Sequence, residues 1–266
     1  MPLEKGQWVF PKGPSKLFNF GGWLTNGLVG TLSQVGLNWL NNFHGHNIEI
    51  LENAVAKRPK EQPLITVSNH VSCLDDPMLW GCLKWRTILN RTRIRMTPSA
   101  HDIVFTKKAH TIFFSLGKCV PVVRGDGVYQ RGIDYCIDYA NSGGWVHVFP
   151  EGKVNMTHEV MRLKWGVGRI IAECRIDPLV IPFWHVGMDE VLPNREPYIP
   201  QLGRKVTILV GKPLHFQELL RQLRLENRVP VEIRKTITDA IQHEFISLRA
   251  KAEALHYGKQ EDSHIS

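Results

Sequence analysis

The stretch Pro63-Leu-Ile-Thr-Val-Ser-Asn-His70-Val-Ser-Cys-Leu-Asp-Asp-Pro77 passes from an apolar run into a polar loop. The apolar, partly β-branched run over residues 64–68 is typical of a buried strand. Pro77 suits the first position of a helix, which we predict over residues 78–84. The polar residues of this stretch therefore lie at a strand-to-helix junction.

Similar runs recur along the chain at the spacing of an α/β fold. The predicted strands cover residues 64–68, 94–97, 120–123, 145–149, 179–183 and 206–210, and the predicted helices residues 78–84, 129–140, 164–172 and 218–257. This alternation predicts an α/β fold, namely a single domain with a mostly parallel sheet flanked by helices. Functional residues of such folds gather in loops at the ends of the strands.

The length of 266 residues suits one such domain. We expect it at residues 46–258, after an N-terminal arm (1–45) and before a short tail (259–266). A connector over residues 49–62 is expected to begin as a helix and end as a loop. Lys and Arg number 33 against 25 Asp and Glu, and the resulting net charge of +8 attracts polyanions such as anionic lipid. Nucleic acid is disfavoured, because the basic residues are dispersed and form no recognisable reader motif.

The cysteines and histidines indicate no metal site. The cysteines form no C-x-x-C pair and are scattered at Cys73, Cys82, Cys119, Cys136 and Cys174. This pattern argues against a disulfide framework and against zinc, and the sequence also lacks an H-E-x-x-H motif. We therefore predict neither a metal nor a cofactor.

The N-terminal arm has neither a signal peptide nor a clear transmembrane helix. Residues 17–43 are apolar and uncharged until His44, but amide side chains interrupt them. One interpretation is a helix in the bilayer interface that contacts lipid through Trp23, Leu24, Leu28 and Trp39. The other is a helix packed onto the core of the domain. This segment alone supports both equally.

The polar loop combines a histidine with two carboxylates. Asp76 before Pro77 is a good N-cap, and Ser72 and Asp75 have capping-box spacing. If Asp76 caps the helix, Asp75 is free to accept a hydrogen bond from one imidazole nitrogen of His70 and leave the other as a general base. On this segment alone, catalysis and helix capping are equally supported.

Two further segments have residue types suited to a site. Arg124 follows the predicted strand 120–123 and can bind phosphate through its guanidinium group, while Gly117 and Lys118 precede that strand. The apolar run 145–149 ends abruptly in Pro150-Glu151-Gly152, which fixes a carboxylate on a rigid support. Taken alone, the first is a weak signal and the second is more simply an ordinary strand-terminating turn.

The order of these segments is more specific than any one of them. Asn69-His-x4-Asp75, Gly117-x6-Arg124, Phe149-Pro-Glu-Gly152 and Ile181-Pro-Phe-Trp184 follow one another as in the glycerolipid acyltransferase superfamily, which this sequence resembles. Trp145-Val-His, Trp184-His-Val-Gly-Met188 and Val191-Leu-Pro-Asn194 extend the resemblance over nearly the whole chain, to a CoA-independent branch of that superfamily.

The resemblance implies roles for individual residues. His70 is expected to be the base that deprotonates a lipid hydroxyl, and Asp75 to orient it. The residues expected to bind substrate are Asn69, Lys118, Arg124, Glu151, Gly152 and Lys153. Many acyl-CoA-dependent members follow Glu-Gly with Thr or Ser and then Arg, whereas this chain has Lys153-Val-Asn155, which favours a donor other than acyl-CoA.

The resemblance also implies a function. We expect a CoA-independent transacylase that acts between phospholipids and lysophospholipids and remodels cardiolipin from monolysocardiolipin. It is expected on mitochondrial inner and outer membranes, peripheral or monotopic and facing the intermembrane space, with self-association left open. The alternatives are an acyl-CoA-dependent lysophospholipid or glycerol-phosphate acyltransferase, and a basic lipid-binding protein without enzymatic activity.

Overall fold

The computed structural model describes residues 8–11 and 15–258. Seven strands of this part form one sheet in the order β1-β7-β6-β2-β5-β3-β4. Their bounds are β1 Asn42–His46, β2 Leu64–Ser68, β3 Arg95–Ala100, β4 Cys119–Val122, β5 Trp145–Val148, β6 Leu179–Val186 and β7 Lys205–Val210. Strands β6, β2, β5, β3 and β4 run parallel, β7 is antiparallel to β6, and β1 is parallel to β7.

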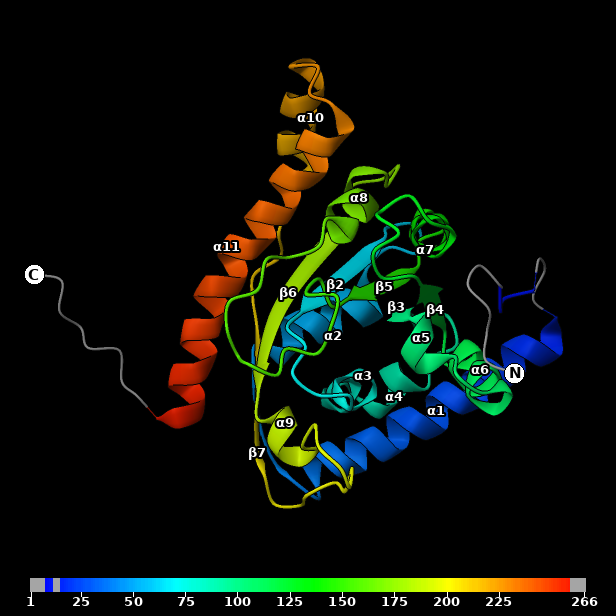
Figure 1. Cartoon of the computed structure of the whole chain (residues 1–266), viewed down its shortest axis with the longest axis vertical. Coiled ribbons are helices and arrows are strands. Elements are labelled where there is room, and N and C mark those ends of the chain that lie inside the picture. Colours follow the sequence, from blue (N-terminus) through cyan, green and yellow to red (C-terminus); the bar gives the residue numbers. More distant parts are fainter. Residues whose placement is uncertain (1–7, 12–14, 259–266) are drawn as a thin grey trace, which may run out of the picture.

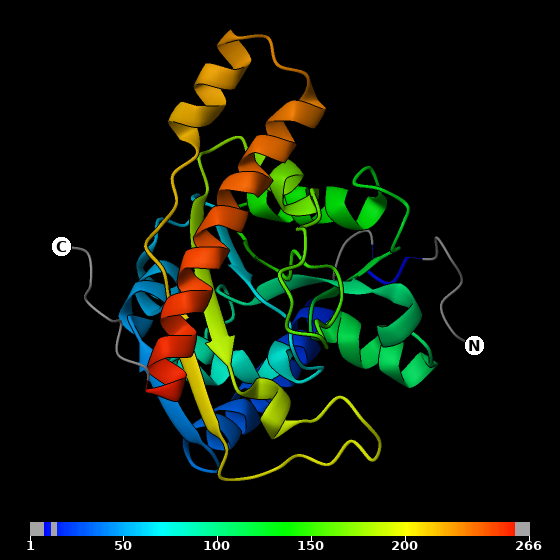
Figure 2. The same ribbon diagram turned by 60° about the vertical axis from the view of Figure 1, so that its left-hand side comes forward.

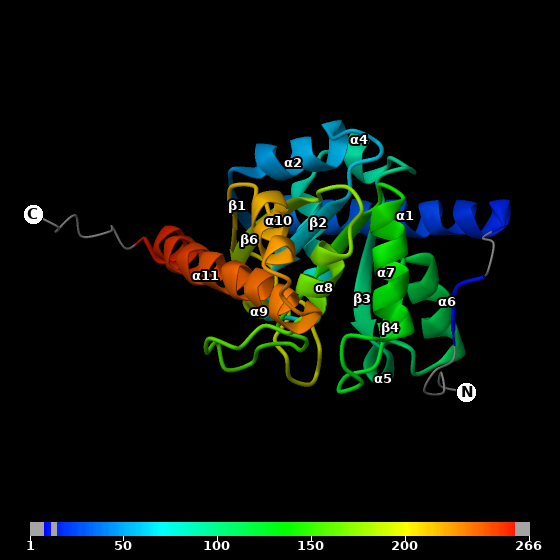
Figure 3. The ribbon, with the colours of Figure 1, turned by 90° about the horizontal axis from the view of Figure 1, so that it is seen from above.

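Helices cover both faces of the sheet (Figure 1). Their bounds are α1 Lys16–Asn38, α2 Ile48–Lys57, α3 Asp75–Met78, the 3-10 helix η1 Leu79–Cys82, α4 Trp85–Ile88, α5 His101–Val104, α6 Lys108–Leu116, α7 Arg131–Asn141, α8 Gly166–Ala172, α9 Met188–Val191, α10 Gln217–Leu225 and α11 Pro230–Tyr257. Seen from above, α1, α2 and α4 lie on one side of the sheet, and α7, α8 and α11 lie on the other (Figure 3). The expected single α/β domain with a mostly parallel sheet is thus confirmed.

The strands are apolar on both faces because each face is covered. In β2, Leu64 packs into a core with Leu51 of α2, whereas its neighbour Ile65 packs into a second core with Ile137 of α7 and Ile241 of α11. Alternating side chains of a strand point to opposite faces, so a strand between two helical layers needs apolar residues in succession. This explains the continuous apolar run from which the strand was predicted.

Most predicted elements are present, but two predicted helices differ and one strand was not predicted. The predicted helix over 78–84 is replaced by the short turns α3, η1 and α4, which lie against α1. The predicted helix over 218–257 is two helices, because Asn227 adopts a left-handed conformation and Pro230 begins α11. Strand β1 was missed; it is an edge strand with three of its five residues exposed, and its sequence lacks an apolar run.

Helix α1 agrees with both interpretations of the arm, because one of its faces packs on the domain and the other is exposed and apolar. Its buried face is lined by small residues, and Gly30 lies so close to Ile88 that a Cβ atom there would overlap it. The opposite face exposes an apolar ridge, which consists of Leu17, Phe20, Leu24, Leu28 and Leu32. Among the described residues, no helix combines the length and the apolarity that crossing a membrane requires.

The division into arm and domain stays a prediction. Strand β1 spans the expected boundary at residue 45 and pairs with β7, so the segment before the boundary supplies an edge strand to the sheet. The expected tail over residues 259–266, like residues 1–7 and 12–14 of the arm, lies outside the described residues.

The parallel strands bring their following loops to one edge of the sheet. In Figure 2 the arrowhead of β6 points toward α9 and the loop that precedes β7. Because β2 lies between β5 and β6 and runs parallel to both, the loops after these three strands meet at this edge. Ligands of open parallel sheets bind at the carboxyl ends of the strands, and the polar loop after β2 lies there.

Candidate active site

His70 and Asp75 form a hydrogen-bonded pair directly after β2. Nδ1 of His70 lies 2.8 Å from Oδ2 of Asp75, and the aspartate side chain is fully buried. A carboxylate accepts only, so Nδ1 of His70 carries the hydrogen. The imidazole is thereby fixed in the tautomer that leaves Nε2 available to a substrate, as a general base requires.

The loop itself holds the Asp75 carboxylate in place. The backbone N–H groups of Val71 and Ser72 donate to the same Oδ2 atom over 2.7 and 2.9 Å. The bond from Ser72 matches the return bond of a capping box, so Asp75 closes the turn and orients the imidazole at once. The two interpretations of this residue from sequence are therefore not alternatives.

The imidazole of His70 is supported on one face and open at its edge. Its ring stacks on Phe149, with centroids 4.2 Å apart, and its side chain is 19% exposed. Phe149 follows β5, so the neighbouring strand fixes the plane of the ring. A stacked ring with one accessible edge can approach a substrate without losing its orientation.

Asp76 does not cap a helix, contrary to our prediction. Its backbone is non-helical (φ −98°, ψ 98°), as that of an N-cap would be, but its carboxylate is engaged elsewhere: it forms an ion pair with Arg95 of β3 and accepts from Nε1 of Trp80 over 2.6 Å. Burial, the largest influence, raises the pKa of Asp76, yet Arg95, His147 and the bond from Trp80 hold it below its ordinary value.

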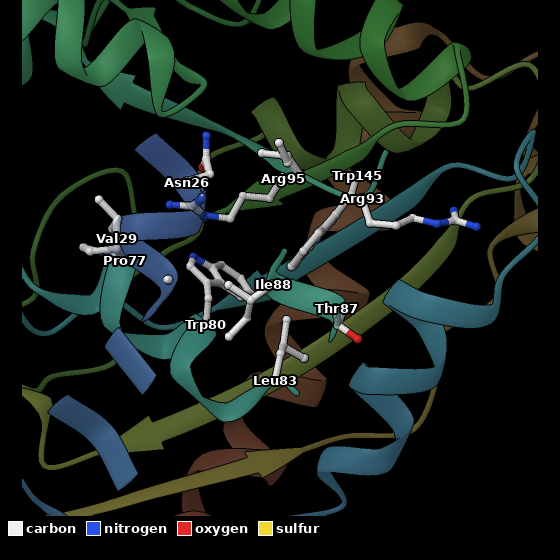
Figure 4. A pocket seen from close by; sticks show the side chains of 12 residues that line it. Asn26, Val29, Pro77, Trp80, Leu83, Thr87, Ile88, Arg93, Arg95 and Trp145 are labelled. Carbon is white, nitrogen blue, oxygen red and sulfur yellow. Dashed lines mark hydrogen bonds between the residues drawn. The ribbon is translucent and has the colours of Figure 1, made fainter. Parts of the chain in front are cut away.

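The side chains that bind Asp76 line a cavity of about 40 Å³ between α1 and the sheet (Figure 4). Arg95 also donates to Oδ1 of Asn26, a residue of α1, over 3.3 Å. Asp76 therefore fastens the catalytic loop to β3 and, through Arg95, to α1, while its neighbour Asp75 faces His70.

Glu151 lies behind the His70 loop and is 3% exposed. Its Oε1 accepts the backbone N–H of His70 over 3.3 Å, and its Oε2 is buried without a hydrogen-bond partner among the described residues. Burial raises the pKa of Glu151 to about 7, although the bonds from His70 and Asn155 act in the opposite direction. Near neutral pH this carboxyl group is therefore divided between its neutral and charged forms.

The turn after Glu151 borders the site. Gly152 has a φ of +74°, which favours glycine, and both Gly152 and Lys153 are exposed. Two residues on, the backbone N–H of Asn155 donates to the carbonyl oxygen of His70 over 2.6 Å. The turn thus binds the His70 loop at one point and presents Lys153 to solvent beside it.

Asn69 has a position different from the one we expected. It is 1% exposed, and its side-chain amide bonds the backbone N–H and carbonyl oxygen of His185, each over 2.9 Å. Both ends of the amide are used within the protein, so Asn69 fastens β2 to β6 and does not face a substrate. The motif could not reveal this, because the partner lies 116 residues away.

The structure separates Lys118 from Arg124. Lys118 precedes β4, at the opposite edge of the sheet from His70, and its Nζ donates to the hydroxyl of Tyr139 over 3.3 Å. Lys118 therefore lies away from the His70 loop, and its role in binding substrate stays a prediction. Arg124 follows β4 at the same edge as His70, is exposed, and pairs with Asp102 over 2.5 Å. Strand β4 is three strands from β2, or about 15 Å at the usual spacing.

Sequence reasoning missed the residues that hold the loop from its other side. Asn194 donates to the carbonyl oxygen of Val71 over 2.6 Å, and the hydroxyl of Ser72 donates to the carbonyl oxygen of Leu192 over 3.0 Å. Asn194 ends one of the motifs in the sequence, which was the available signal. The loop after β6 therefore completes the support of the segment that carries the base.

A histidine base oriented by a buried aspartate, at the carboxyl ends of a mostly parallel sheet, defines a group-transfer site. The model of the acyltransferase family matches residues 46–186, which include His70, Asp75 and Glu151. The fold and the site are thus those of an acyltransferase enzyme. The crystal structure of the 1-acyl-sn-glycerophosphate acyltransferase PlsC from Thermotoga maritima has the same fold, with a TM-score of 0.57 and 17% identity over 85% of this chain and 80% of that one.

Similar proteins show to which family of acyltransferases the chain belongs. Tafazzin of Drosophila melanogaster is 50% identical over 251 residues, which are 94% of this chain and 66% of the fly protein. The protein named taffazin of Dictyostelium discoideum is 37% identical over 207 residues, which are 76% of this chain and 72% of that protein. The chain therefore belongs to the tafazzin family of acyltransferases. It spans somewhat less than two thirds of the length of the fly relative.

Proposed function

We propose that this protein is a CoA-independent transacylase that moves fatty acyl chains from phospholipids to lysophospholipids and thereby remodels cardiolipin. The observation that carries the proposal is the pair of His70 and Asp75, in which Nδ1 is occupied by the carboxylate and the side chain of His70 is partly exposed. The substrates follow from membership of the tafazzin family and from the sequence after Glu151.

The chemistry follows from this geometry. Nε2 of His70 takes the proton from the hydroxyl group of the lysolipid acceptor as the hydroxyl oxygen attacks the ester carbonyl of the donor lipid. Asp75 stabilises the imidazolium that forms. When the ester bond of the donor breaks, the imidazolium returns the proton to the leaving oxygen, so that one lysolipid is consumed and another is released.

The segment after Glu151 and Gly152 supports a lipid donor rather than acyl-CoA. Many acyl-CoA-dependent members have Thr or Ser and then Arg here, whereas this chain has Lys153-Val-Asn155. Asn155 is buried and bonds the His70 loop and the carbonyl oxygen of Glu159. Lys153 is therefore the cation that this turn offers to a lipid phosphate, and Arg124 lies further along the same edge of the sheet.

Helix α1 supports action at a membrane surface. Its ridge of exposed leucine and phenylalanine side chains faces away from the domain and can insert into lipid, and the net charge of +8 favours anionic lipid. Of the four residues we expected to contact lipid, Leu24, Leu28 and Trp39 are exposed. Trp23 is different, because its indole N–H donates to the carbonyl oxygen of Leu89 and Arg91 covers its ring.

We propose mitochondrial membranes, on surfaces that face the intermembrane space, as the location, on the strength of the family resemblance. Protease treatment of isolated mitochondria tests this part separately. The protein should resist digestion in intact mitochondria and be degraded once the outer membrane is ruptured. Digestion in intact mitochondria would contradict the orientation.

The activity is tested with the purified full chain and lipid vesicles. Monolysocardiolipin serves as acceptor, and either phosphatidylcholine with a labelled acyl chain or labelled acyl-CoA serves as the only donor. We expect labelled cardiolipin with phosphatidylcholine and a loss of about 10²–10⁴-fold in rate for His70→Ala. His44→Ala, on the exposed edge strand β1, is the matched control and should keep full activity.

Two results would contradict the proposal. Product with acyl-CoA alone would favour the acyl-CoA-dependent alternative. Undiminished transfer by His70→Ala would remove the assigned base. A variant that still binds vesicles but has lost transfer is what the proposal requires, and it excludes a lipid-binding protein without enzymatic activity.

A further inference from the structure

A second histidine lies behind the catalytic pair. His185 belongs to β6, is 1% exposed, and its Nε2 lies 2.9 Å from the backbone carbonyl oxygen of Asn69. The same nitrogen lies 3.7 Å from Oδ2 of Asp75, the atom that also binds His70. The carboxylate is therefore between two imidazoles, one partly exposed and one enclosed.

The hydrogen bond defines the form of His185. The carbonyl oxygen of Asn69 can only accept, so Nε2 carries a hydrogen. Nδ1 is buried and has no hydrogen-bond partner among the described residues. A second hydrogen on Nδ1 would bury an unpaired donor together with a charge, which costs more than an unpaired acceptor. The geometry therefore favours a neutral ring that donates from Nε2.

His185 and Asn69 bind one another in both directions. The side chain of Asn69 bonds the backbone N–H and carbonyl oxygen of His185, and the ring of His185 bonds the backbone of Asn69. The register between β2 and β6 ends with Ser68 opposite Phe183. Beyond that pair, these three bonds continue the connection between the strands and fix the peptide that leads into His70.

We propose that His185 is a positioning residue for the base His70. Its Nε2–H donates to the Asn69 carbonyl oxygen, which also accepts from the hydroxyl of Ser68 over 3.1 Å, and lies 3.7 Å from the Asp75 carboxylate. One enclosed side chain therefore contacts both the start of the loop and the orienting group. His185 does not touch substrate, because its side chain is fully buried. Its loss should therefore lower kcat and leave KM for the lysolipid nearly unchanged. The inference rests on the proposed role of His70.

Three substitutions separate the hydrogen bond from the volume of the ring. His185→Gln can place an amide donor near the position of Nε2. His185→Asn is polar but too short to reach the Asn69 carbonyl group, and His185→Leu fills the space without a donor. The matched control is His256, a buried residue of α11 whose Nδ1 bonds the hydroxyl of Thr207 over 2.9 Å. His256→Gln and His256→Leu report the cost of changing a buried histidine away from the catalytic loop.

The readouts are kcat and KM in the phosphatidylcholine assay, the urea midpoint, and the NMR signal of the proton between His70 and Asp75. We expect kcat to fall about 10- to 100-fold for His185→Leu and His185→Asn, since small displacements of a catalytic group have effects of this size. His185→Gln should recover most of the loss. The NMR signal should shift or broaden in the Leu and Asn variants and stay near its wild-type position in Gln.

The inference is overturned if His185→Asn has wild-type kcat, or if the Gln and Asn variants are equally impaired. Equal impairment of the Gln and Asn variants would show that the loss of kcat comes from removing the ring and not from removing its Nε2–H donor. If His185→Leu does not fold, the comparison of the two polar variants still decides. Failure of the proposed function is distinguishable, because His70→Ala would then retain transfer whatever the His185 variants do.

Discussion

The backbone N–H of His70 lies 3.3 Å from Oε1 of Glu151, so a carboxyl group from the end of β5 holds the loop that carries the base. From the family resemblance we expected Glu151 to bind substrate. In this structure the side chain is 3% exposed, and its contact is with the protein. A role in binding substrate stays a prediction, whereas the contact with the loop is observed.

The buried carboxyl group of Glu151 should make stability depend on pH. Its pKa is raised from 4.5 to about 7 in the folded protein, so from pH 4.5 upward the unfolded chain ionises first and the folded state loses stability until about pH 7. The penalty reaches about 3 kcal/mol, at about 1.4 kcal/mol for each pKa unit. Glu151→Gln should remove this penalty. In urea unfolding, the gain in free energy of unfolding of the variant over wild type should therefore be larger at pH 8 than at pH 4.5, by up to that amount.

The control for this measurement is Glu218→Gln on the exposed side of α10. The pKa of Glu218 is lowered, chiefly by its hydrogen bond from Arg221, so its substitution should not produce a gain at high pH. An equal pH dependence of wild type and Glu151→Gln would show that the carboxyl group of Glu151 is not penalised by burial.

Asp75→Asn should retain the fold and lose most of the activity. An amide oxygen can still accept from the N–H groups of Val71 and Ser72, but a neutral side chain cannot stabilise the imidazolium of His70. We expect kcat to fall about 10²- to 10⁴-fold with an unchanged circular dichroism spectrum. Asp189→Asn, which alters the partly exposed pair with His158, is the control, and equal rates for the two variants would refute the orienting role.

Arg95→Met should destabilise the protein by about 3–5 kcal/mol, because it leaves the buried carboxylate of Asp76 without its ion pair. Adding Asp76→Asn should restore part of the loss, since the amide oxygen can still accept from Trp80. Urea unfolding of the single and double variants measures the coupling. Arg221→Met, which breaks an exposed pair, should leave the urea midpoint nearly unchanged. A similarly small effect of Arg95→Met would contradict a buried pair.

The double variant Leu24→Glu with Leu28→Glu should weaken vesicle binding at least tenfold while leaving the urea midpoint unchanged. Both side chains are more than half exposed on the ridge of α1, so the charges cost nothing in the folded protein but oppose insertion into lipid. Co-sedimentation with cardiolipin-containing vesicles measures the effect. Leu225→Glu on α10 is an equally exposed control and should bind normally, and unchanged binding of the double variant would exclude the ridge as the contact.

Much of the fold could be predicted because local sequence reports local burial. The six predicted strands are present, since a strand covered on both faces needs a continuous apolar run. Strand β1 escaped because three of its five residues are exposed and it has no apolar run, unlike the other edge strand, β4. The helix predicted after Pro77 is absent. Gly81 of that segment packs against the backbone of Ser33 in α1, a contact that sequence spacing does not encode.

The candidate site divides in the same way. The sequence by itself determined the α/β class, the pairing of His70 with Asp75, and the ordered motifs that identify an acyltransferase, because these depend on residues close together in the chain or on their order. Only the tertiary structure decided that Asp76 pairs with Arg95, that Arg124 and not Lys118 shares the edge of the sheet with His70, and that His185 lies behind Asp75. Those relationships depend on strand order and direction, which join residues far apart in the chain and set which end of each strand meets the site.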